Sequence, residues 1–186
     1  MGSRANSRTT AVKLISGVLY PVNSPELFEW TSARLSETFG DIERTSEAYT
    51  FDCTDYYMDI SSNLARRFFS FKGLRHPLGL VAWKKLAISL EAESSPESAC
   101  RRRVNIDPGY VDGARIILAS TKDHAHRIYL HDDIYAEVTM CRRKFGWESF
   151  SYTFPDFASG IYDAFLDAVR CDWKRDVRFL KQSEAG

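Results

Sequence analysis

The sequence from His126 to Met140 contains two β-rich runs, "HRIYL" and "IYAEVTM", on either side of "HDD". Short runs of β-branched and aromatic residues that are joined by a few turn-forming residues predict an antiparallel hairpin. This hairpin favours a fold whose sheet is mostly antiparallel.

The rest of the chain adds strands and helices to this hairpin. Further strands are predicted at residues 11–21, 42–52, 65–71, 101–106 and 148–154, whereas residues 111–120 fit a strand or a helix and "DPGY" fits a turn. Helices are predicted at residues 23–40, 76–94 and 159–177. The apolar stripe of the second helix is predicted to contain Leu78, Val81, Ala82, Leu86 and Leu90.

The domain organisation follows from this pattern, because no repeat or Pro/Gly-rich linker interrupts it. We expect a single α+β domain at residues 11–180, built from a mostly antiparallel sheet with about three packing helices. Residues 1–10 are small, polar and basic, and are expected to form a disordered tail. Residues 181–186 are expected to be a frayed C-terminus.

Composition excludes several classes of protein. The 186 residues include 25 basic and 25 acidic side chains, and this lack of a basic excess argues against a nucleic-acid partner. The apolar runs are too short to span a membrane and no secretory signal begins the chain, so we expect a cytoplasmic protein without a membrane partner. The four cysteines are far apart, which argues against a zinc ribbon and a disulfide framework.

The hairpin also carries the densest group of polar side chains. If its turn comprises residues 132–133, His126 shares a sheet face with Glu137. If the loop comprises residues 131–133, Arg127 faces Glu137 instead. A one-residue slip therefore exchanges a His–Glu pair for an Arg–Glu pair.

Two kinds of chemistry fit this group. His126 could act as a general acid or base that Glu137 orients. Alternatively, His124, His126 and Glu137 could bind a divalent metal together with Asp52, since His-x-His on a strand places both rings on one face. A solvent-facing hairpin with ordinary cross-strand ion pairs is the simpler interpretation.

Polar residues near other strand ends could join the same site. Asp55 and Asp107 are candidate catalytic carboxylates, although both also suit turns. The candidate ligand-binding residues are Arg66, Lys122 and Arg127 for an anion, and Tyr57, Tyr110 and Asn105 for the pocket walls. No Walker A or G-x-G-x-x-G sequence is present, so any phosphate would be held by side chains of this kind.

The ordered segments "KLISGVLY", "FDCTDYY", "RRFFSF", "VNIDPGY", "LASTKDHAHRIYL", "IYAEVTM" and "YTFPDF" together resemble the bacterial domain of unknown function 4416 family. The resemblance covers residues 13–175. It implies an uncharacterised family whose members are sometimes labelled GTP-binding, and it supplies no reaction. Where the family pattern has glycines in the hairpin loop, this chain has His131 and Asp133. His131 is therefore a poor catalytic candidate.

The sequence favours a small enzyme, or a ligand-binding protein, that acts on an anionic metabolite such as a phosphorylated or nucleotide-like compound. It does not decide whether the chain is an enzyme. The alternative is a non-catalytic interaction protein that forms a homodimer through aromatic surface or a sheet edge. The first hypothesis predicts that the named side chains converge in one concave site. The second predicts an exposed apolar patch or a free edge strand.

Overall fold

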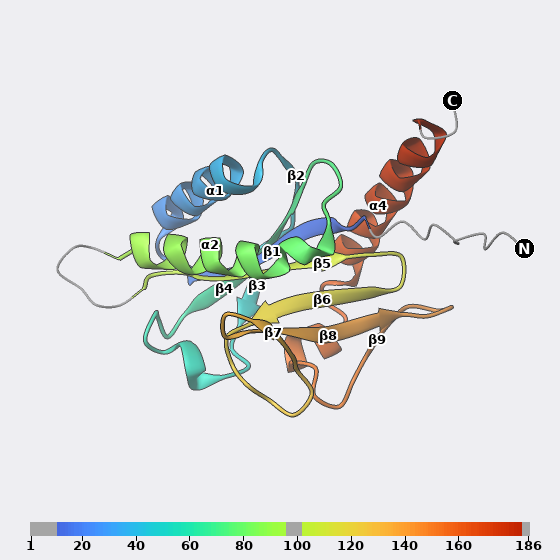
Figure 1. Cartoon of the computed structure of the whole chain (residues 1–186). Coiled ribbons are helices and arrows are strands. Elements are labelled where there is room, and N and C mark those ends of the chain that lie inside the picture. Colours follow the sequence, from blue (N-terminus) through green and yellow to red (C-terminus); the bar gives the residue numbers. More distant parts are fainter. Residues whose placement is uncertain (1–10, 96–101, 184–186) are drawn as a thin grey trace, which may run out of the picture.

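The computed structural model describes residues 11–95 and 102–183. Within them, nine strands form one antiparallel sheet in the order β2-β4-β1-β5-β6-β8-β7, with β3 paired to β4 and β9 paired to β8 (Figure 1). The strands are β1 (Lys13–Pro21), β2 (Ile42–Thr45), β3 (Tyr49–Phe51), β4 (Leu64–Phe71), β5 (Asn105–Val111), β6 (Arg115–Ser120), β7 (Ile128–His131), β8 (Ile134–Arg142) and β9 (Trp147–Ser149). The predicted α+β class with a mostly antiparallel sheet is confirmed.

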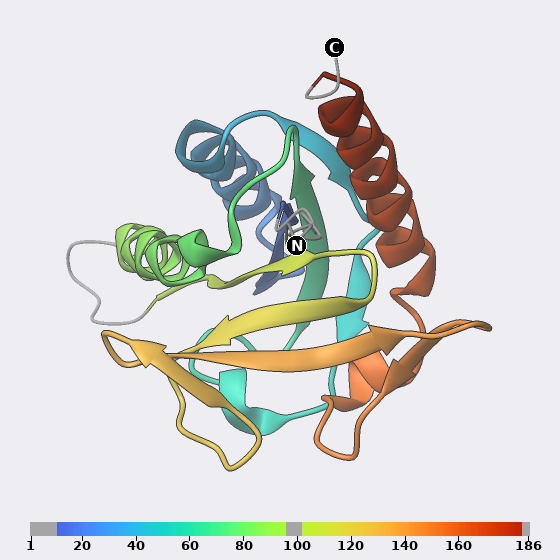
Figure 2. The ribbon, with the colours of Figure 1, turned by 45° about the vertical axis from the view of Figure 1, so that its right-hand side comes forward.

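Helices cover both faces of the sheet (Figure 2). They are α1 (Pro25–Phe39), α2 (Leu80–Glu93), α3 (Pro155–Ala158) and α4 (Asp163–Ser183), with single 3₁₀ turns η1 (Asp55–Tyr57) and η2 (Pro77–Gly79). Alternate residues of β1 point to opposite faces: Leu14 and Val18 pack under α1 and α2, and Ile15 packs with α3 and α4. We call these the α1–α2 face and the α4 face. No helix in the described ranges is long and apolar enough to cross a membrane.

The sheet opens between β5 and β6. The two strands pair over only three residues of β5, beginning at Gly109, and the preceding half of β5 pairs with β1 alone. Helix α2 occupies the open side. Glu91 Oε1 accepts a hydrogen bond from the Ile106 amide at 2.7 Å, and Lys84 Nζ donates one to the Ile106 carbonyl at 2.8 Å. These two side chains take the place of a strand partner, so β6 is free to diverge.

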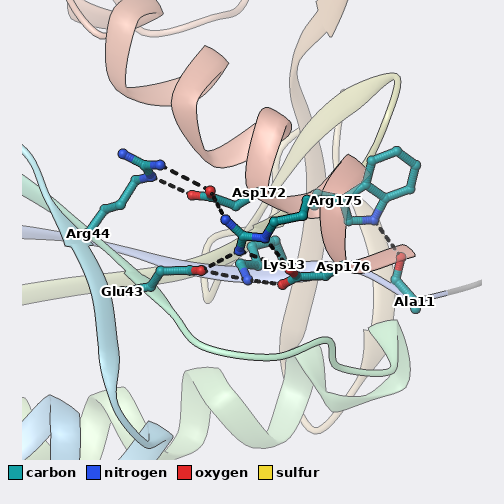
Figure 3. Close-up of polar contacts among 8 residues, drawn as sticks. Ala11, Lys13, Glu43, Arg44, Asp172, Arg175 and Asp176 are labelled. Atoms are coloured by element: carbon teal, nitrogen blue, oxygen red, sulfur yellow. Dashed lines mark hydrogen bonds and ion pairs between the residues drawn. The ribbon is translucent and has the colours of Figure 1, made fainter. Parts of the chain in front are cut away.

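Ion pairs between charged side chains of β1, β2 and α4 hold helix α4 on the sheet (Figure 3). Three basic and three acidic residues form this cluster, which we call the α4 clamp: Lys13, Glu43, Arg44, Asp172, Arg175 and Asp176. Nearby, the indole N–H of Trp173 donates to the Ala11 carbonyl at 2.8 Å. The cluster balances its own charge, so the buried side chains of Lys13 and Asp172 each have partners of opposite charge.

The turn predicted at "DPGY" is wrong, because these residues continue β5. Pro108 has no N–H to donate, but it lies in the half of β5 that has no second strand beside it. A proline is tolerated in a strand at such an edge.

Other boundaries also differ from the prediction. Residues 42–52 form two short strands, β2 and β3, and residues 115–120 are a strand. The strand expected at 148–154 ends at Ser149, because the chain then turns. In this turn the Phe150 amide donates a hydrogen bond to the Thr153 hydroxyl at 2.8 Å. Helix α4 begins at Asp163 and continues to Ser183. The expected tail at residues 1–10 lies outside the described residues, as do residues 184–186.

Candidate functional site

A cavity of about 140 Å³ lies where β5 and β6 diverge. Side chains reach it from β4, β5, β6, β8 and α3, from α2 through the gap, and from the loops around η1 and after β6, and Gly17 of β1 adds backbone to the wall. Its walls carry five basic and three acidic side chains: Arg66, Lys84, Arg102, Lys122, Arg127, Glu91, Asp107 and Glu137.

The wall formed by α2 and β5 is a closed ring of five polar side chains. Lys84 Nζ donates to Asp107 Oδ1 at 3.1 Å, and Asn105 Nδ2 donates to Asp107 Oδ2 at 2.7 Å. Arg102 Nη1 donates to Asn105 Oδ1 at 2.8 Å and to Glu91 Oε2 at 2.9 Å. Glu91 Oε1 closes the ring 3.9 Å from Lys84 Nζ. Every member is held by at least two others, so the wall is preorganised.

The pKa values of the two carboxylates in this ring are shifted in opposite directions. Burial opposes the ionisation of Asp107, but the charges of Lys84 and Arg66 and the hydrogen bonds from Lys84 and Asn105 outweigh it, so the pKa of Asp107 lies below its ordinary value. Burial raises the pKa of Glu91 against the opposing charge of Lys84. At neutral pH Asp107 is therefore an ionised hydrogen-bond acceptor.

The opposite wall is formed by β6, β8 and the loop between β6 and β7. Glu137 Oε2 accepts from Arg127 Nε at 2.8 Å and lies 3.1 Å from His126 Nε2. Arg127 Nη1 also donates to Ser120 Oγ at 2.7 Å and to the Lys122 carbonyl at 3.0 Å. Arg127 thereby fixes the loop that carries Lys122 over the cavity.

The hairpin register combines the two arrangements considered from sequence. Asp132 and Asp133 have φ values of 53° and 57°, as a two-residue type I′ turn requires. A register shift at Leu130 then pairs Tyr129 with Tyr135. His126 and Arg127 both precede β7, and both contact Glu137. Each arrangement considered from the sequence placed only one of the two beside Glu137.

His126 supports this wall from outside the cavity. Its ring stacks on Tyr152 with centroids 4.2 Å apart, and His124 stacks on His126 at 5.7 Å. Neither histidine lines the cavity. His126 is thus placed to orient Glu137, and the column of parallel rings limits how the imidazole can turn.

A buried ion pair lies at the base of the cavity. Arg66 on β4 pairs with Asp156 on α3, and the Tyr162 hydroxyl donates to Asp156 Oδ2 at 2.7 Å. The Arg66 guanidinium also lies over the Phe51 ring, 4.4 Å from its centroid. Arg66 is 6% exposed, so this pair anchors the cavity floor.

Two further polar groups in the cavity wall lack an ordinary partner among the described residues. The Lys122 ammonium has no carboxylate partner there and lies over the Tyr56 ring, 3.1 Å from its centroid. Thr139 is 1% exposed, and its hydroxyl has no hydrogen-bond partner in the same ranges. Lys122 is exposed, whereas the Thr139 hydroxyl is buried.

Most of the side chains named from the sequence converge here. Those in the cavity wall are Glu137, Asp107, Arg66, Lys122, Arg127, Tyr57 and Asn105. Tyr110 does not line the cavity, because alternation along β5 turns it to the α1–α2 face. The side chain of Asp55 lies outside the described residues.

The metal set named from the sequence is not assembled. No group of three or more His, Cys, Asp or Glu side chains suited to a metal ion occurs within residues 11–95 and 102–183. Asp52 follows β3, and His124 packs on His126 instead of turning toward Glu137. Glu137 instead pairs with the side chains of Arg127 and His126, and the arginine neutralises its charge.

Sequence reasoning missed Lys84, Glu91, Arg102 and Thr139. Lys84 and Glu91 are seven residues apart on α2, a spacing of two helical turns that places them on one face. That spacing was the available signal, but a charged helical face usually faces solvent. For Thr139 the available signal was its position two residues after Glu137, which places both side chains on one face of a strand.

Fold and site together define a single-domain α+β protein with a polar cavity at the split edge of an antiparallel sheet. The chain matches the family described as Domain of unknown function (DUF4416) over residues 10–173 and therefore belongs to it. No curated protein and no solved structure matches the chain.

Proposed function

We propose that the protein binds a small anionic metabolite, of the phosphorylated or nucleotide-like class, in this cavity, either as an enzyme or as a ligand-binding protein. The observation that carries the proposal is the charge arrangement of the walls. Four of the five basic side chains have carboxylate partners, whereas Lys122 at the cavity opening has none among the described residues. An anion would supply the missing partner.

The neighbouring groups support an anion at that position. Arg127 lies beside Lys122 and already bonds its carbonyl, so an anionic group would meet two cations held in fixed relation. The backbone amide of Lys122 already donates a hydrogen bond to Ser120 Oγ at 3.1 Å. Side chains and not a glycine-rich loop would therefore hold the anion, in keeping with the absence of a phosphate loop from the sequence.

The size of the cavity limits the ligand. About 140 Å³ is room for roughly ten water molecules, at about 10–15 Å³ for each. A small phosphorylated metabolite is therefore the class of ligand that we propose for this space. Within the site, Asp107 and Glu137 are the carboxylates available to accept a proton or a hydrogen bond from a bound ligand.

A thermal-shift and calorimetric screen of the full chain tests the proposal, with inorganic phosphate, sugar phosphates and mononucleotides as ligands. A ligand at 100 times its Kd stabilises the native state by about 2.7 kcal/mol, which raises Tm by roughly 5–10 °C for a chain of this size. Lys122→Ala should weaken binding by roughly tenfold or more, because it removes a charge-assisted hydrogen bond.

Lys174→Ala is the matched control, since Lys174 is an exposed lysine of α4 away from the cavity walls. It should leave binding unchanged. If no anion raises Tm or gives a calorimetric signal at millimolar concentration, the proposal is wrong. Equal weakening by both substitutions would also contradict it, since the effect would then be one of overall charge.

A specific surface feature favours the second candidate, a homodimer. Strand β7 pairs with β8 on one side, and its other edge has no strand partner in the part of the chain that the structure describes. Ile128 and Tyr129 on this strand are 65% and 56% exposed. An apolar, unpaired edge is suited to self-pairing across a two-fold axis.

Light scattering across a concentration series tests this second candidate. The homodimer predicts a doubling of mass that Ile128→Lys abolishes and Ile161→Lys, at a 45% exposed position on the α4 side, does not. A mass that stays monomeric at all concentrations would contradict the homodimer. Neither outcome affects the cavity proposal.

A further inference from the structure

The cavity contains more than an anion site, because its inner walls present acceptors that would repel an anion. Asp107 is ionised, and its side chain is 29% exposed. Each of its oxygens accepts one internal hydrogen bond, from Lys84 and from Asn105. A carboxylate oxygen accepts two hydrogen bonds, so one acceptor position on each oxygen remains for a ligand donor.

Thr139 supplies the second inner group. Val138 pairs with Ile117 and Met140 pairs with Ile116, so Thr139 is the extra residue of a β-bulge. Its carbonyl accepts a hydrogen bond from Thr153 Oγ1 at 2.7 Å, while its own buried hydroxyl has no partner among the described residues. Strand alternation places Thr139 on the same face of β8 as Glu137, and both residues line the cavity.

These groups come from opposite walls. Asp107 belongs to β5 and Thr139 to β8, on the two sides of the gap between β5 and β6. Lys122 is exposed at the opening, whereas Thr139 is almost completely buried. A ligand that meets all three therefore carries an anionic group at its outer end and neutral hydrogen-bonding groups at its inner end.

We infer that the cavity recognises a sugar phosphate, with the phosphate at Lys122 and Arg127 and ring hydroxyls at Asp107 and Thr139. This inference rests on the proposed function and names the class of ligand within it. A hydroxyl donates to the Asp107 carboxylate, and another pairs with the Thr139 hydroxyl, which both donates and accepts. The apolar lining from Phe68 and Phe157 leaves room for the C–H face of a sugar ring.

Calorimetry of the full chain with five ligands tests the inference: inorganic phosphate, n-propyl phosphate, ribose 5-phosphate, free ribose and phosphoethanolamine. Ribose 5-phosphate should bind at least tenfold more tightly than n-propyl phosphate, which should bind about as well as inorganic phosphate. Free ribose should bind most weakly, because it lacks the anionic group.

Thr139→Val isolates the role of the inner hydroxyl. It should weaken ribose 5-phosphate roughly three- to tenfold, leave n-propyl phosphate unchanged and not lower Tm, because no internal hydrogen bond of the described residues is lost. Thr50→Val, at an exposed position of β3, is the control and should change neither affinity. Asp107→Asn should also reduce the preference for ribose 5-phosphate while leaving n-propyl phosphate bound.

The failures are distinguishable. If no phosphate compound binds, the proposed function fails together with this inference. If n-propyl phosphate binds as tightly as ribose 5-phosphate, or Thr139→Val does not reduce the difference, the anion site stands and hydroxyl recognition is wrong. If phosphoethanolamine binds more tightly than ribose 5-phosphate, the carboxylate wall selects an ammonium group and the sugar assignment is overturned.

Discussion

Replacing Lys13 by methionine tests how the α4 clamp holds the C-terminal helix on the sheet (Figure 3). Lys13 is completely buried, and its Nζ lies 2.5 Å from both Glu43 Oε2 and Asp176 Oδ2. Methionine keeps most of the apolar stem and removes the charge. The substitution therefore measures the ion pairs and not the packing.

The structure sets the size of the effect. Removing one partner of a buried ion pair costs about 3–5 kcal/mol, because the remaining charge is left without compensation. Here the carboxylates keep a second cation, since Arg175 Nη2 lies 2.7 Å from Glu43 Oε1 and 2.9 Å from Asp176 Oδ1. Both carboxylate side chains are also 17% exposed. We therefore expect the lower end of the range, about 3 kcal/mol.

Urea denaturation followed by circular dichroism gives the free energy of unfolding directly. A loss of about 3 kcal/mol should also lower Tm by roughly 6–12 °C. The loss should change little between 0.05 and 0.5 M salt, because buried pairs are weakly screened. Adding Asp176→Leu to Lys13→Met should recover part of the loss, since it removes a carboxylate that has lost its main partner.

Lys174→Met on the same helix is the control, because its side chain is exposed. It should change the free energy of unfolding by less than about 0.5 kcal/mol. A loss below about 1 kcal/mol for Lys13→Met, or a loss that disappears in high salt, would refute the reasoning that Lys13 is a buried charge compensated by its neighbours in the clamp.

The remaining predictions concern the sheet, the hairpin and acid stability. Gly109→Ala should lower stability by about 3 kcal/mol in urea denaturation, because a Cβ would lie 2.2 Å from the Ile117 carbonyl oxygen. Asp133→Gly should raise Tm by roughly 1–3 °C, since glycine adopts the φ of 57° without steric cost. Burial opposes ionisation of Asp172, but hydrogen bonds and charge from Arg44 outweigh it and hold its pKa below the ordinary value. That stabilisation is present above the unfolded pKa of about 3.9 and is lost as pH falls further, so Asp172→Asn should flatten the acid side of the stability–pH curve.

The sequence predicted the elements whose burial follows one simple pattern. The helix predicted at residues 23–40 corresponds to α1, in which Leu27, Leu35 and Phe39 fall on one face and are buried. In α2 the predicted stripe was only partly right: Val81 and Leu90 are buried, but Ala82 and Leu86 are exposed, as is Leu78 in the preceding η2. Helix α2 is buried on two sides, against the apolar core and against the open half of β5, so a single apolar stripe does not describe it.

The site was partly predictable for the same reason. Asp107 and Lys122 stand out locally because several polar groups cluster in short segments, although Asp107 proved to lie within β5 and not at its end. The remaining wall depends on long-range pairing, because Lys84 reaches β5 only where β6 diverges. The divergence leaves no local signature in the sequence, because it is a property of two strands together.

The two roles of α2 have a consequence for what the cavity can select. Lys84 and Glu91 complete the hydrogen bonding of β5 and also form part of the cavity wall. These two charged side chains are therefore already engaged in contacts that stabilise the fold. A bound anion cannot draw on those charges without weakening β5. In the proposed binding mode, attraction comes from Lys122 and from Arg127, which lie outside β5, and the inner groups are Asp107 and Thr139. Selectivity for a sugar phosphate should then depend more on where its hydroxyls lie than on how much charge it carries, because the inner groups have fixed positions.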